Sequence, residues 1–287
     1  MTQESKNAFR IRLGAVALAL SGALFVLFPV VRPFSDESSL RGAQAFASTS
    51  WVLSHALGMG AFVLLTLGFL GVYIRLQETR AERRAFWALV LSWIGAGMTL
   101  PFFGAEAFSL QVIGQEALNQ NNPAILDLVN SVRFGPGIIF AISGLLLVGV
   151  AAIVVASAVW QSGSLTRWSG VPLAIGLAVY IPQLQGNPSF QPIRIADGLL
   201  IAMGCVWMAW GMSKERDRVT THLGMRGTAL RVGLRDGVHI ASPDCEFRRD
   251  HPGSSTHTQL FVQEYHASRL APAIAAIGIT VLLSPQC

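Results

Sequence analysis

The chain has 287 residues, of which 52% are apolar and only 13% are charged, and its mean hydropathy is +0.50. Soluble domains carry about 25% charged residues, so this composition excludes an ordinary soluble protein and indicates that lipid covers much of the surface. The net charge of +5 does not indicate nucleic-acid binding, because the basic residues flank apolar runs. The three cysteines have no CxxC spacing and predict neither a disulfide framework nor a zinc site.

Six apolar runs predict an all-α transmembrane bundle of six helices, because about 20 apolar residues cross a hydrocarbon core roughly 30 Å thick. The basic residues before the first run also suit a signal peptide. That run is longer than a usual signal core, however, and no cleavage pattern follows it closely, which favours an uncleaved helix. In chain order, the predicted helices cover about residues 13–31, 51–74, 86–110, 138–159, 168–184 and 195–212.

Two of these segments are interrupted. Pro101 lies inside the third helix and predicts a kink. The fifth segment is short and carries Pro172 and Pro182, so the sequence leaves open whether it spans fully. In the polar connection after the third helix, Asn122 followed by Pro123 predicts a capped, short amphipathic helix that ends near Val132.

The distribution of basic residues predicts that both ends of the bundle lie in the cytoplasm. With the N-terminus inside, the outer segments hold four basic residues, which are Arg32, Arg41, Arg133 and Arg194. The cytoplasmic side holds eleven: Lys6, Arg10, Arg12, Arg75, Arg80, Arg83, Arg84, Arg167, Lys214, Arg216 and Arg218. This bias satisfies the positive-inside rule.

The chain therefore divides into a transmembrane domain, residues 1–212, and a cytoplasmic tail, residues 213–287. The tail is expected to be disordered or weakly structured, because nothing in it supplies a core of useful size. Asp236-Gly237 stands between two partly alternating runs and predicts a hairpin over residues 228–242. The tail histidines match no metal-ligand spacing.

Ionisable groups are costly inside a bilayer, so each one is a candidate functional residue. His55, Glu106 and Asp197 lie inside or at the edge of apolar runs. With the predicted topology all three fall near the outer surface, and Arg133 belongs to the same level. These four residues are therefore the candidate proton- or ligand-binding site, gathered around an outward-facing polar cavity.

Two interpretations of these residues remain open. A carboxyl beside an imidazole is a plausible proton relay, and Arg133 opposite an acid either forms an ion pair or accepts an anionic ligand. Alternatively, side chains within one turn of the boundary simply meet headgroups and water, where a charge costs little.

Known catalytic patterns do not appear in the sequence. It contains no HExxH, GxSxG or Walker A motif, and His55 is the single histidine of the membrane region, which argues against a bis-histidine haem. We therefore expect no metal and no cofactor, and an enzyme is the least favoured class.

Three stretches carry a resemblance at the level of pattern: SHALGMGAFVLLTLGFLGVYIRL, FFGAEAFSLQVIG and LTRWSGVPLAIGLAVYIP. Over about residues 10–212 the chain resembles small bacterial integral membrane proteins of unknown activity. The resemblance implies a multi-pass protein of the inner (plasma) membrane and no particular reaction.

Two functions are consistent with these observations. The first is binding or transport of a proton or small solute through the outer cavity. The second is a non-catalytic accessory or assembly role through helix packing and the tail. The expected partners are the lipid bilayer and a small solute or proton, without nucleic acid; homo-oligomerisation is left open.

Overall fold

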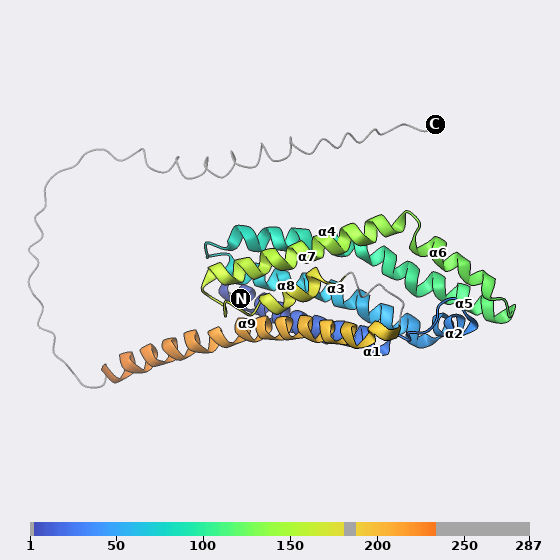
Figure 1. The fold of residues 1–287 in the computed structure, drawn as a ribbon. Helices are drawn as coiled ribbons and strands as arrows, with labels where there is room; N and C mark the ends of the chain where they lie inside the picture. Colours follow the sequence, from blue (N-terminus) through green and yellow to red (C-terminus); the bar gives the residue numbers. More distant parts are fainter. Residues whose placement is uncertain (1–2, 181–187, 234–287) are drawn as a thin grey trace, which may run out of the picture. The chain divides into compact units, whose positions relative to one another are not determined.

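The computed structural model describes residues 3–180 and 188–233, with side chains in the last helix as far as Lys214 (Figure 1). Every regular element in this part is helical, in agreement with the predicted fold class. The elements are α1 (Gln3–Val31), α2 (Leu40–Ala47), α3 (Thr49–Leu76), α4 (Glu82–Gly104), η1 (Ala105–Ser109), α5 (Leu110–Asn119), η2 (Pro123–Leu126), α6 (Asp127–Arg133), α7 (Gly137–Ser162), α8 (Val171–Ala178), η4 (Pro188–Phe190) and α9 (Gln191–Gly233).

Five helical stretches in the described residues are long and apolar enough to cross a membrane: Ser5–Val31, Thr49–Leu76, Glu82–Asn119, Gly137–Ser162 and Gln191–Lys214. Large apolar side chains point outward on them, including Leu20, Trp93, Ile139, Leu146 and Met203. A soluble protein rarely exposes apolar surface on this scale, so these faces suit lipid. Five of the six predicted segments thus have the length and composition of a span.

Neighbouring helices run antiparallel and approach closely where both carry a small residue. In the α1–α3 pair, a Cβ on Gly14 would lie 2.5 Å from the Cα atom of Gly71. The Ser21 hydroxyl also donates to the Ala61 carbonyl at 2.8 Å, which satisfies a buried polar group. In the α4–α7 pair, a Cβ on Gly95 would lie 2.7 Å from the carbonyl oxygen of Gly144. Close backbone approach therefore fixes both pairs.

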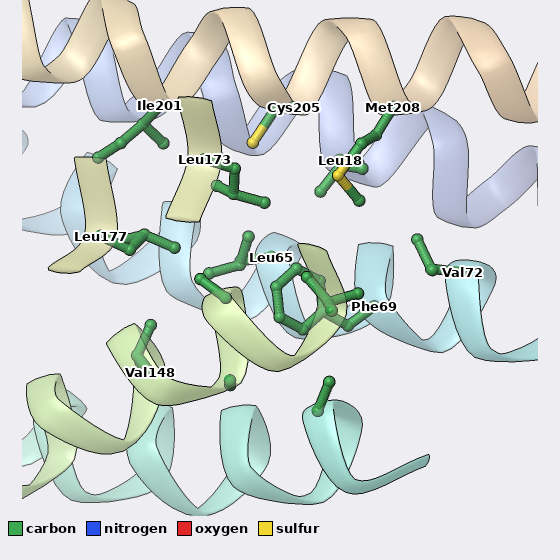
Figure 2. Packing of buried hydrophobic residues seen from close by; sticks show 14 of the residues in the cluster. Leu18, Leu65, Phe69, Val72, Val148, Leu173, Leu177, Ile201, Cys205 and Met208 are labelled. Atoms are coloured by element: carbon green, nitrogen blue, oxygen red, sulfur yellow. The ribbon is translucent and has the colours of Figure 1, made fainter. Parts of the chain in front are cut away.

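The fifth predicted helix, residues 168–184, is helical only over α8, which has eight residues and is about 12 Å long. Residues 181–184 lie outside the described part. α8 packs antiparallel to α7, with Gly170 beside Ala156 and Leu177 beside Gly149. It also lies against α9, and Figure 2 shows Leu173 and Leu177 pointing into the same buried cluster as Ile201 and Cys205. Although α8 is short, it therefore packs antiparallel to both α7 and α9.

The third predicted helix, residues 86–110, continues much further than its apolar run. α4, the π-helical turn η1 and α5 form one 38-residue stretch, Glu82–Asn119, about 57 Å long. This exceeds the roughly 30 Å of a hydrocarbon core. The polar second half stays helical because it packs against α2, which the hydropathy pattern did not predict.

We call α2, α5, η2 and α6 the cap. Figure 1 shows these helices together at one end of the bundle. The cap has its own buried cluster with Trp51 of α3, consisting of Ala43, Phe46, Trp51, Leu110, Ala117, Leu126 and Val129. The predicted short helix is present as η2 followed by α6, and the Asn122 side chain caps it by accepting from the Ala124 N–H at 3.1 Å.

The last helix is longer than expected. The sequence predicted a helix over 195–212 and a tail from 213, whereas α9 continues without interruption from Gln191 to Gly233. The predicted hairpin over 228–242 is therefore wrong for residues 228–233, which are helical; residues 234–242 lie outside the described part. Lys214, Glu215 and Arg216 are good helix formers and no proline occurs between residues 213 and 233, so the helix continues although the apolar run has ended.

Gly95 and Gly97 of α4 provide a matched test of the α4–α7 contact. We expect Gly95→Ala to destabilise the protein by about 1–3 kcal/mol, because its Cβ would overlap the backbone of α7. A Cβ on Gly97 meets no atom within 4 Å, so Gly97→Ala should be neutral or stabilise by about 0.5–1 kcal/mol through helix propensity. Thermal unfolding in detergent measures both; equal effects would contradict the packing described.

Candidate functional site

The π-helical turn η1 brings Glu106 to the boundary between bundle and cap. Its hydrogen bonds run from residue i to i+5, a local widening that is frequent at functional sites. The Trp51 indole N–H donates to the Glu106 carbonyl oxygen at 2.7 Å, which ties the turn to α3. Glu106 is only 5% exposed, so its carboxylate requires partners within the protein.

Arg133, the last residue of α6, supplies these partners. Its Nε donates to Oε1 of Glu106 at 2.6 Å and its Nη2 donates to Oε2 at 3.0 Å, a bidentate pair. Its Nη1 also hydrogen-bonds Glu37, in the loop between α1 and α2. Burial alone would lower the pKa of Arg133, but the hydrogen bonds and charges of Glu106 and Glu37 outweigh this and raise it above its ordinary value. The guanidinium therefore stays charged and joins three segments.

His55 of α3 faces the same carboxylate. Its Nδ1 lies 2.8 Å from the Trp51 carbonyl oxygen. Because a carbonyl only accepts, Nδ1 carries the proton, and Nε2 of the neutral ring is then an acceptor. Nε2 lies 3.8 Å from Oε2 of Glu106, beyond hydrogen-bond distance. The described residues give this nitrogen no hydrogen-bond donor.

Arg32, directly after α1, is the second buried cation of the site and is 4% exposed. Its guanidinium carbon lies 4.8 Å from the Trp51 ring centroid and 4.9 Å from that of Phe34. Its Nη2 is 3.8 Å from Oε1 of Glu37, and its buried Nε has no hydrogen-bond partner among the described residues. Burial lowers the pKa of Arg32 to about 10, so it is still charged at neutral pH.

These groups enclose a cavity of about 80 Å³ beneath the cap. A water needs about 10–15 Å³ of such space, so the cavity has room for about five to eight non-hydrogen atoms. Aromatic side chains form most of the wall, and Phe28 and Phe103 pack on the His55 ring. The lining residues are Phe28, Arg32, His55, Phe102, Phe103, Glu106, Arg133, Phe134 and Ile138. An apolar cavity with a few convergent polar groups is the usual form of a small-ligand site.

The structure brings together three of the four residues that the sequence analysis selected. His55, Glu106 and Arg133 line one cavity, whereas Asp197 does not. Asp197 lies on α9 and faces α8, with its Oδ1 3.3 Å from where Gly176 would carry a Cβ. Topology predicts the depth of a residue but not its direction around the bundle, and α9 presents Asp197 to α8 rather than to α4.

Sequence reasoning missed two members of the cluster. Arg32 entered only as one of the outer basic residues, and Glu37 was not selected, because charged loop residues after a span are usually solvated. A signal was available in the two prolines, Pro29 and Pro33, and the Phe34 that surround Arg32. Such a rigid aromatic segment is unusual for a solvated loop.

Together, the apolar helices indicate a multi-pass helical membrane protein, and the cavity places buried charged groups at one end of its bundle. The chain matches no protein-family model, and neither the curated proteins nor the solved structures give a match. Within residues 3–180 and 188–214, no three His, Cys, Asp or Glu side chains are grouped as metal ligands. The geometry of the cavity is therefore the feature of the molecule that bears on its function.

The Trp51–Glu106 hydrogen bond can be tested by a conservative substitution. We expect Trp51→Phe to lower the free energy of unfolding by about 1–3 kcal/mol, because the buried Glu106 carbonyl loses its indole donor. Trp93 is 55% exposed on the lipid-facing side of α4, so Trp93→Phe should change the stability by no more than about 0.5 kcal/mol. Unfolding titrations in detergent compare the two variants, and equal losses of unfolding free energy would show that the Trp51–Glu106 hydrogen bond does not contribute to stability.

Proposed function

We propose that this protein binds a small solute in the cavity beneath the cap and transports it across the membrane. The observation that carries the proposal is the 80 Å³ cavity lined by Arg32, a buried arginine whose Nε has no partner among the described residues. Ionisable groups buried in a membrane protein usually mark a substrate or ion path. No reaction is proposed, because the site holds no activated nucleophile.

Burial favours this function over the simpler interpretation that the charges meet headgroups and water. Arg32, His55 and Glu106 are 4%, 2% and 5% exposed, so bulk solvent does not satisfy them. A purely structural ion cluster is expected to satisfy all its polar groups. Arg133 and Glu106 meet this expectation, whereas the Nε atom of Arg32 and the Nε2 atom of His55 have no hydrogen-bond partner among the described residues, and both residues line the cavity.

The proposed topology has six passes with both ends in the cytoplasm of a bacterial cell, and places the cap outside. The eleven-to-four distribution of basic residues supports this orientation. The antiparallel packing of α8 against α7 and α9 supports a sixth pass, although α8 is shorter than a usual span. Short or interrupted helices often line the sites of transporters. In this topology the cavity opens toward the outer surface of the inner membrane.

A second candidate is proton exchange between His55 and Glu106. The 3.8 Å separation of Nε2 and Oε2 favours it. Protonation of the ring would make Nε2 a hydrogen-bond donor to the carboxylate, and a water molecule could also relay a proton between the two groups. This function uses the same two residues but does not need the apolar wall or Arg32. A non-catalytic accessory role, the other hypothesis from the sequence, would act through α9 beyond Lys214 and the tail.

Cysteine labelling tests the six-pass topology. In a chain with Cys245 and Cys287 replaced by serine, we introduce Asp127→Cys, Gln161→Cys or Ser189→Cys, three exposed positions. A membrane-impermeant maleimide should label positions 127 and 189 in intact cells, and position 161 only after permeabilisation. Labelling of positions 161 and 189 from the same side would exclude a pass between α7 and α9.

A ligand panel tests solute binding. Thermal unfolding of the purified full chain in nanodiscs is measured in the presence of neutral, cationic and anionic solutes of up to eight non-hydrogen atoms. A solute at 100 times its Kd should stabilise the chain by about 2.7 kcal/mol. Ile138→Phe fills the cavity and should abolish the shift, whereas Ile153→Phe, on the outer face of the same helix, should leave it. A panel without any stabilising solute, or a shift that Ile138→Phe leaves intact, contradicts the proposal.

A further inference from the structure

We infer that the solute is a small monocarboxylate that carries a hydroxyl group, bound through its carboxylate to Arg32 and through its hydroxyl to His55. This inference rests on the proposed function, since it names the class of molecule that the cavity accepts. Three observations lead to it: the charge of the lining, the groups left without partners, and the size and apolar character of the wall.

The charged groups of the lining favour an anion. They are Arg32, Arg133 and Glu106, and with His55 neutral their sum is +1. Both oxygens of Glu106 already accept from Arg133, so the bidentate pair is internally neutral. Glu37 lies near both arginines but is hydrogen-bonded to Arg133. Among the described residues, Arg32 has only the longer contact to Glu37, 3.8 Å from its Nη2, so its guanidinium is the charged group of the lining that is least fully paired and most suited to an anionic ligand.

Arg32 lines the cavity with a guanidinium whose hydrogen-bonding groups are incompletely paired within the described residues. The rings of Trp51 and Phe34 lie near its guanidinium carbon and hold the group in place, while the buried Nε–H has no partner among the described residues. The planar N–H edge of a guanidinium matches two carboxylate oxygens, which gives a stronger and more directional contact than a single point charge.

His55 adds a second requirement. With Nδ1–H donated to the Trp51 carbonyl, Nε2 is an acceptor that lines the same cavity. A carboxylate oxygen would repel this lone pair, whereas a hydroxyl hydrogen would satisfy it. The ligand should therefore present an acceptor to Arg32 and a donor to His55. A simple fatty acid supplies only the first.

The remaining surface limits the body of the ligand. Phe28, Phe102, Phe103, Phe134 and Ile138 form an apolar wall, and the volume admits about five to eight non-hydrogen atoms. Lactate has a carboxylate, a hydroxyl and a methyl group within this size, and it serves as the probe. Propionate lacks the hydroxyl and lactamide lacks the charge, so the three compounds separate the two polar contacts.

The test measures the dissociation constants of the three compounds by calorimetry on the full chain in nanodiscs. Propionate should bind about 2- to 10-fold more weakly than lactate, because one neutral hydrogen bond is lost. Lactamide should bind about 10- to 100-fold more weakly, because the contact to a charged group is lost. Octanoate serves as the lipid-like control and should not bind, since it exceeds the cavity.

Variants assign each contact to its residue. Arg32→Gln should make lactate as weak as lactamide, while Arg41→Gln, an exposed arginine of the cap, should leave binding unchanged. Arg32→Lys keeps the charge without the planar edge and should retain part of the affinity for lactate. Residual binding by this variant would show that loss of binding in Arg32→Gln is not caused by misfolding. His55→Leu should make lactate equal to propionate and leave propionate itself unaffected.

The outcomes separate this inference from the function on which it rests. If lactamide or a cationic solute binds as well as lactate, and Arg32→Gln does not alter the ratio, solute binding stands and the carboxylate inference is wrong. If lactate and propionate bind equally in the unchanged protein, the hydroxyl contact is wrong. If no compound of any charge binds, both the inference and the proposed function fail. Tight octanoate binding would identify a lipid-derived acid instead.

Discussion

The bidentate contact between Arg133 and Glu106 is the interaction on which the arrangement of cap and bundle depends. Glu106 belongs to the π-helical turn between α4 and α5, and Arg133 ends the last helix of the cap. The same guanidinium reaches Glu37 in the loop after α1. One side chain thus joins three segments distant in sequence, at a depth where water does not satisfy an isolated charge.

This contact also explains why His55 and Arg32 have incompletely satisfied hydrogen-bonding groups within the described residues. Because Arg133 hydrogen-bonds both oxygens of Glu106, that carboxylate is paired without a hydrogen bond from His55. The imidazole is oriented instead by its hydrogen bond to the Trp51 carbonyl. Arg32 shares Glu37 with Arg133, and its buried Nε has no hydrogen-bond partner among the residues that the structure describes. The cavity beneath the cap is therefore lined by one fully hydrogen-bonded ion pair and by two residues, Arg32 and His55, whose Nε and Nε2 atoms have no hydrogen-bond partner among the described residues.

Much of the fold follows from the sequence, because long apolar runs in a membrane protein have few structures available to them. The spans now represented by α1, α3, α4, α7 and α9 were all predicted. Helix ends were less predictable: α5 and the extension of α9 are polar segments whose helicity depends on neighbours or on propensity. Predicted depth selected His55, Glu106 and Arg133, which line one cavity, but it also selected Asp197, which faces α8. Arg32 and Glu37 were missed because only tertiary packing buries those loop residues.

The most direct test of this account is the coupling free energy between Arg133 and Glu106, from a double-mutant cycle of Arg133→Met, Glu106→Gln and the double variant. Unfolding is followed in detergent at neutral pH. The two substitutions should be non-additive by about 1.5–3 kcal/mol, since either one leaves the other group buried and unpaired. Losses that add within about 0.5 kcal/mol would contradict the claim that this pair holds the cap to the bundle.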